Sequence, residues 1–188
     1  MHRKKETVTT AVWEDNRERW VCQLIDERWS TLFRIYPIKD LVHHPKVRDW
    51  CGLPYPNHPK GCPNFNIDKE KCPPNAPYVT DVFDLEKPLY FVHSEFDLAG
   101  HAEKMKIRHP NWTERQCRNV LYWQNTSRKQ AKERAILAME FTRSKKFTLM
   151  PEALGVNVYV TGRWCGLKLE MIDGLKICRH VALLGDTI

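Results

Sequence analysis

Eight of the twelve prolines in this 188-residue chain fall between residues 45 and 77, together with Cys51, Cys62 and Cys72. Proline fixes φ and has no amide donor, so this density excludes a continuous helix or a central strand. Irregular segments of this length are usually functional or disordered. Because aromatic residues and three cysteines are interspersed, we expect residues 45–77 to form an ordered loop that a bound ligand holds in shape.

The context of the three cysteines points to a metal. Cys62 and Cys72 are each followed directly by proline, as in ferredoxin-type cluster motifs. Zinc sites more often use cysteines two to four residues apart, whereas ten residues separate Cys51 from Cys62 and nine separate Cys62 from Cys72. We therefore predict one iron–sulfur cluster on Cys51, Cys62 and Cys72, with zinc as the alternative. The remaining interpretation is three unconnected cysteines packed in a rigid loop.

Three cysteines leave a fourth ligand position to be assigned. His58 lies inside the loop, and Cys165 could arrive from the C-terminal half of the chain. An open fourth position is typical of a catalytic metal site. A filled one favours electron transfer or a structural role, and the sequence leaves these alternatives open.

Bulk composition bounds the class of protein. With 42% hydrophobic and 28% charged residues, the chain is typical of a globular domain, and its length fits a single domain over residues 1–188. Seven cysteines, an odd number, follow a start without an apolar signal segment, which argues against a disulfide framework and indicates the cytoplasm. No apolar run approaches the roughly 20 residues that span a bilayer, so we expect no membrane partner.

Apolar periodicity predicts an α+β fold, with a small sheet, several helices and the long Pro/Cys-rich metal-binding loop. The predicted helices cover residues 15–34, 99–108 (capped by Asp97) and 113–143, where the polar stretch 124–130 could break the helix. The predicted strands cover residues 89–92, 156–160 and 177–184.

Two segments carry a family resemblance. Gly61-Cys62-Pro63-Asn64-Phe65, followed by Lys71-Cys72-Pro73-Pro74, resembles the CPxYG…CPP signature of an uncharacterised family of predicted metal-binding proteins, which are thought to hold iron–sulfur clusters. Residues 150–161 are similar to that family's Met-Glu-Ala-x-Gly-Ile-Asp-Val segment. The resemblance implies a metal ligand set and no particular reaction. The family usually carries further cysteines just before the second segment; residues 141–147 contain none, so the resemblance implies a single centre.

The net charge of +7 permits a polyanionic partner. Basic residues gather between Arg128 and Lys146, but Glu133 and Glu140 are interleaved, which favours a solvated helix face. We therefore expect a small molecule or a redox partner, with a redox or sulfur-transfer role. The alternative is a zinc-stapled, non-catalytic module that binds nucleic acid through its basic helix. Glycine-rich phosphate loops, Gly-x-Ser-x-Gly and His-Glu-x-x-His are absent from the sequence, so the enzyme classes that these motifs mark receive no support.

Overall fold

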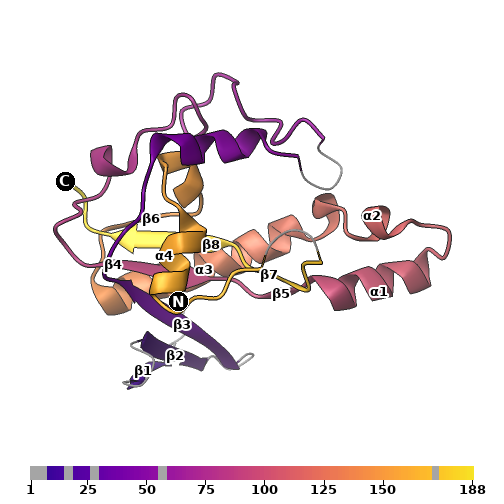
Figure 1. The fold of residues 1–188 in the computed structure, drawn as a ribbon. Helices are drawn as coiled ribbons and strands as arrows, with labels where there is room; N and C mark the ends of the chain where they lie inside the picture. Colours follow the sequence, from indigo (N-terminus) through magenta and orange to yellow (C-terminus); the bar gives the residue numbers. More distant parts are fainter. Residues whose placement is uncertain (1–7, 15–18, 26–29, 55–58, 171–173) are drawn as a thin grey trace, which may run out of the picture.

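The computed structural model describes residues 8–14, 19–25, 30–54, 59–170 and 174–188. Within these ranges six strands form one antiparallel sheet in the order β1-β2-β3-β4-β8-β6 (Figure 1). Their bounds are β1 Val8–Glu14, β2 Arg19–Ile25, β3 Ser30–Ile38, β4 Leu89–His93, β8 Val181–Gly185 and β6 Lys146–Thr148. A separate pair consists of β5 Phe96–Asp97 and β7 Ile177–Cys178. The predicted α+β fold class is confirmed.

Helices fill the connections between the strands. The α-helices are α1 Leu98–Arg108, α2 Glu114–Cys117, α3 Gln124–Thr142 and α4 Val158–Trp164. The 3₁₀-helices are η2 Pro45–Gly52, η3 Val79–Asp81, η4 Val120–Tyr122 and η5 Pro151–Leu154. None of the helices in the described ranges has the length and apolar character needed to cross a membrane.

The centre of the sheet is buried on both faces, because successive residues of its strands pack into opposite clusters. In β8, Leu184 packs with Ala135 and Ala138 of α3. Its neighbour Leu183 packs on the other face with residues of η3, η5 and α4. The sheet therefore lies between α3 and a second layer made of short helices, and the cysteine-containing loop continues from that second layer (Figure 1).

The start of the loop is attached to the segment between η5 and α4. The amide of His44 donates to the carbonyl oxygen of Gly155 at 2.8 Å, and the amide of Asn157 donates to that of Val42 at 2.8 Å. Residues 45–77 form η2 followed by turns and bends, as the proline content predicts. Residues 55–58 of this loop lie outside the described part of the chain.

The predicted helix over residues 15–34 is wrong in its described part, because residues 19–25 form β2 and residues 30–34 belong to β3. Residues 15–18 and 26–29 lie outside the described part of the chain. Apolar residues at positions 20 and 24 fit a helical spacing, but with position 22 they also alternate with a period of two. Pairing of Trp20 with Trp13 in β1 and with Ile35 in β3 decides for the strand. Tertiary pairing of this kind overrides local spacing.

The predicted strand over residues 156–160 is also wrong. The side-chain oxygen of Asn157 accepts a hydrogen bond from the amide of Val160 at 3.0 Å and so caps α4.

The predicted helix 113–143 is divided earlier than expected, between α2 and α3 at residues 118–123, and the polar stretch 124–130 is helical. The strand at 89–92 and the helix at 99–108, with its Asp97 cap, are confirmed, and 177–184 forms the two strands β7 and β8.

Candidate metal centre

Main-chain contacts bring the first two cysteines of the loop together. The amide of Cys62 donates to the carbonyl oxygen of Cys51, near the end of η2, at 2.7 Å. Gly61, at φ +78°, permits this approach: a Cβ on it would lie 2.5 Å from the carbonyl carbon of Gly52 and 2.6 Å from the carbonyl oxygen of Cys51. Only glycine combines this backbone angle with this lack of space.

Arg48 connects η2 to the far end of the loop. Its Nη2 donates to the carbonyl oxygen of Pro74 at 2.7 Å and also to that of Ala76. The amide of Ala76 in turn donates to the carbonyl oxygen of Cys72 at 2.8 Å. The third cysteine is therefore held near η2 by a charged side chain that binds main-chain oxygens.

The other two cysteines contribute to the electrostatics of Cys51. The pKa of Cys51 is raised to about 11, first by burial and then by the charges of Cys62, Glu152 and Cys72, while Arg48 acts in the opposite direction. All three cysteines are partly buried and free. Burial and the charges of these neighbours therefore oppose ionisation of Cys51, and Arg48 partly offsets them.

Glu152 lies in the second segment of the family resemblance but was not predicted as a ligand, and the structure places it near the cysteines. It lies in η5, and burial raises the pKa of its carboxyl group to about 7. Its charge also raises the pKa of Tyr159, after burial. The Tyr159 ring packs against Trp50 of η2 at a centroid distance of 5.9 Å, so η2 and the η5–α4 segment meet at the cysteines. An acidic residue inside the apolar run 150–154 was the signal in the sequence.

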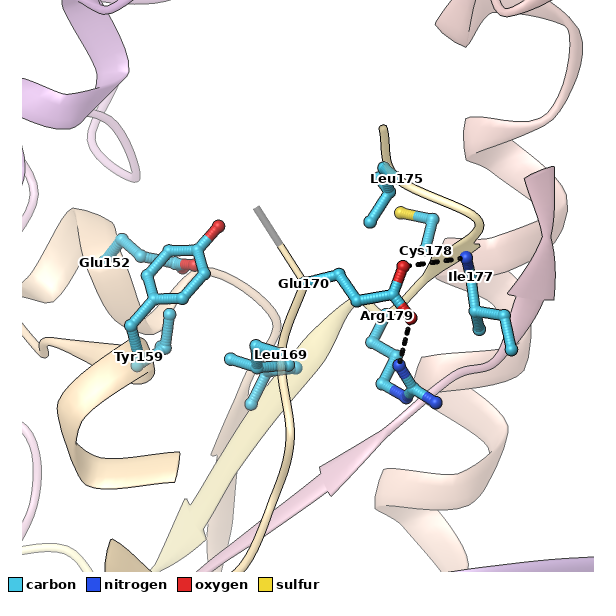
Figure 2. A pocket seen from close by; sticks show the side chains of 10 residues that line it. Glu152, Tyr159, Leu169, Glu170, Leu175, Ile177, Cys178 and Arg179 are labelled. Carbon is cyan, nitrogen blue, oxygen red and sulfur yellow. Dashed lines mark hydrogen bonds and ion pairs between the residues drawn. The ribbon is translucent and has the colours of Figure 1, made fainter. Parts of the chain in front are cut away.

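Glu152 also lines a cavity of about 130 Å³ beside α4 (Figure 2). Across the cavity, Glu170 accepts hydrogen bonds from the amides of Lys176 (3.0 Å) and Ile177 (3.4 Å) and pairs with Arg179 at 3.7 Å. These backbone bonds, with Arg179, lower the pKa of Glu170. The cavity therefore has a hydrogen-bonded carboxylate on one wall and Glu152, whose pKa burial raises to about 7, on the other.

The structure positions one of the two predicted fourth ligands. Cys165 follows α4, and its Sγ donates to the carbonyl oxygen of Gly162 at 3.4 Å. Its charge is one of the smaller causes that raise the pKa of Tyr36 in β3. Burial raises the pKa of the Cys165 thiol to about 11. His58 lies outside the described residues. The assignment of either residue as a ligand remains a prediction, and Glu152 joins them as a candidate.

A serine–histidine network lies at the other end of the cavity-lining strand β7. Ser127 Oγ is 2.7 Å from His180 Nδ1 and 2.8 Å from Ser94 Oγ. Ser127 is 1% exposed and Ser94 is not exposed, so a substrate cannot reach either hydroxyl. The network joins α3 to the residues that follow β4 and precede β8.

Within the described ranges, no three side chains of His, Cys, Asp or Glu are close enough to hold a metal ion as they stand. The cysteine thiols are within electrostatic range of one another, so ligation requires their side chains to turn toward a common point. No protein-family model, curated protein or solved structure matches this chain.

Proposed function

We propose that this protein binds one metal centre through Cys51, Cys62 and Cys72, as an iron–sulfur cluster or, alternatively, as zinc. The supporting observation is that three partly buried thiols share one irregular loop, and that burial, followed by the charges of Cys62, Glu152 and Cys72, raises the pKa of Cys51. A bound cation offsets this shift, because thiolates ligate metals and metal binding releases their protons. Soft sulfur donors select iron–sulfur clusters and zinc over hard cations. A reducing compartment such as the cytoplasm suits these free thiols.

Glu152 extends this ligand set. Its charge raises the pKa of Cys51 together with the charges of Cys62 and Cys72. Its helix η5 packs beside η2, and the following helix α4 contacts η2 through the Trp50–Tyr159 rings. We propose that Glu152 supplies the fourth donor or orients the cysteines from just outside the ligand set. When bound, an iron–sulfur cluster supplies one-electron redox chemistry or sulfur transfer. The neighbouring cavity gives Glu152 a side accessible to a small molecule.

Anaerobic purification of the full chain, followed by iron, sulfide and zinc analysis and visible absorption, tests the metal. Iron and sulfide in a coloured protein are expected. Colourless protein with one zinc would overturn the iron–sulfur cluster but would support a metal site at these cysteines. Folded protein that holds no metal after reconstitution would overturn both the cluster and the zinc alternative. Cys51→Ser, Cys62→Ser and Cys72→Ser should each lose the metal. Cys117→Ala, in a separate cluster with Ala102 and Met105, should retain it.

Three further variants identify the fourth donor. Glu152→Gln keeps the size of the side chain and removes its charge, and we expect it to weaken metal affinity about 10–100-fold, the usual effect of ligand-supporting groups. Cys165→Ser and His58→Ala should retain wild-type affinity. Loss of metal in Cys165→Ser or His58→Ala, with Glu152→Gln unaffected, would transfer the role to that residue and remove Glu152 from the centre.

A further inference from the structure

Three aromatic rings form a stack in the helical part of the molecule that contains α1, α2 and η4. The rings of His109 and Trp112 are 4.0 Å apart at 13°, and those of Trp112 and Tyr122 are 5.5 Å apart at 24°. They come from the end of α1, the following connection and η4, in the helical part that extends beyond the sheet (Figure 1). We call His109, Trp112 and Tyr122 the aromatic stack.

The aromatic stack packs against the protein interior through Trp112, and Tyr122 at its end is exposed to solvent. Trp112 packs against the buried cluster of Ala102, Met105 and Cys117, and Lys106 Nζ donates to the Trp112 carbonyl oxygen at 2.6 Å. Tyr122 at the end of the stack is 51% exposed, and the adjacent Leu121 is 75% exposed. A pre-ordered ring with an exposed surface can accept another flat ring without a further ordering cost.

Positive charge is concentrated on the same segment. Residues 104–129 contain seven lysines and arginines and a single acidic residue, Glu114, so they account for six of the seven net positive charges of the chain. Glu114 is itself paired with Arg118. Exposed cations precede and follow the aromatic stack in the chain: Lys104, Lys106 and Arg108 on α1, and Arg128 and Lys129 in the first turns of α3.

We propose that the aromatic stack and its flanking cations bind single-stranded nucleic acid, with a base stacked on Tyr122 and phosphates at α1 and α3. Stacking platforms combined with basic tracks are the general means of binding single strands without sequence preference. A duplex hides its base faces and would use only the charges, and an acidic protein would not use the ring. This surface uses none of the residues proposed for the metal site.

Fluorescence anisotropy of a labelled twelve-nucleotide oligothymidylate, titrated with the purified full chain at low salt, tests the proposal. Tyr122→Ala should weaken binding about tenfold, the range measured for loss of one stacked base. Tyr122→Phe should bind like the wild type because it keeps the ring. Trp164→Ala removes a ring that is 61% exposed on α4 and should bind normally. Equal affinities for Tyr122→Ala and Trp164→Ala would overturn the proposal.

Two ligand controls separate stacking from charge. An oligonucleotide of the same length with abasic sites keeps the phosphates and should bind more weakly than oligothymidylate by a similar factor. Affinity should also fall as salt rises, with a smaller slope for Arg108→Ala and Arg128→Ala, because fewer counterions are released. Equal binding of the abasic strand or of duplex DNA would overturn the single-strand proposal, and so would the absence of binding at low salt.

Discussion

Individual residues determine whether the cysteine loop can close. The cysteines themselves were readable from the sequence, because proline after cysteine is a recognisable pattern. The contributions of Arg48 and Gly61 were not, since Arg48 binds carbonyl oxygens 26 and 28 residues away and Gly61 packs on backbone atoms. Main-chain partners leave no trace in side-chain identity, so sequence patterns identify the candidate ligands and miss what assembles them.

Gly61→Ala should open the loop. The added Cβ meets the backbone at Gly52 and Cys51, and φ +78° disfavours any L side chain, so we expect a loss of about 2–4 kcal/mol. Limited proteolysis and urea unfolding would measure it, with metal content as a further readout. Gly166→Ala is the matched control: its φ is +80° and nothing lies within 4 Å of the added atom, so it should cost only about 1 kcal/mol. Equal losses would mean that close packing at Gly61 is unimportant.

At the scale of elements, helix caps and strand pairing decided which of the secondary-structure predictions from sequence periodicity were correct. The helix at 99–108 was predictable because Asp97 caps it, with Oδ1 accepting from the Gly100 amide at 2.9 Å, and because its pattern is unambiguous. The segment after Gly155 alternates like a strand, but the cap at Asn157 gives α4. For β2, strand pairing with distant residues outweighed a spacing that fits either structure.

Asn157→Ala should therefore destabilise α4. Loss of the side-chain oxygen leaves the Val160 amide without its cap, which typically costs about 1 kcal/mol. Asn157→Asp keeps an acceptor at the same place and should retain wild-type stability. Urea unfolding of the three proteins under one buffer gives the comparison, and a loss in Asn157→Asp equal to that in Asn157→Ala would show that the cap is not the cause.

For the molecule as a whole, the two-sided burial of the sheet could not be read from the sequence. Apolar runs at 89–92 and 181–184 predict buried strands, but not that they pair with each other. The position of Glu152 is likewise a product of packing, because its neighbours at the cysteines and the cavity come from η2 and β7. Assembly of distant segments, more than local structure, defines the candidate site.

Acid should weaken the assembled fold through two histidines. Burial lowers the pKa of His93 to about 4 and that of His180 to about 4, below the ordinary value near 6.5. Between pH 6.5 and 4 the unfolded chain therefore binds more protons, so the free energy of unfolding is fully retained above pH 6.5 and falls by a few kcal/mol in total on acidification.

Urea unfolding at pH 7 and pH 5 measures this dependence. His180→Gln can still accept the hydrogen bond of Ser127 and does not titrate, so it should lose less stability than the wild type over this interval. Parallel losses in both proteins would assign the acid sensitivity to other groups.

The closure of the loop by Arg48 has an evolutionary consequence. Its two acceptors are peptide oxygens, which every amino acid provides, so substitutions at the accepting positions do not remove the contacts. Exposed side chains between the cysteines can drift while Arg48, Gly61 and the three thiols keep the loop shut. Variation in such a loop would alter the surface around the three cysteines without altering the contacts that hold the loop closed.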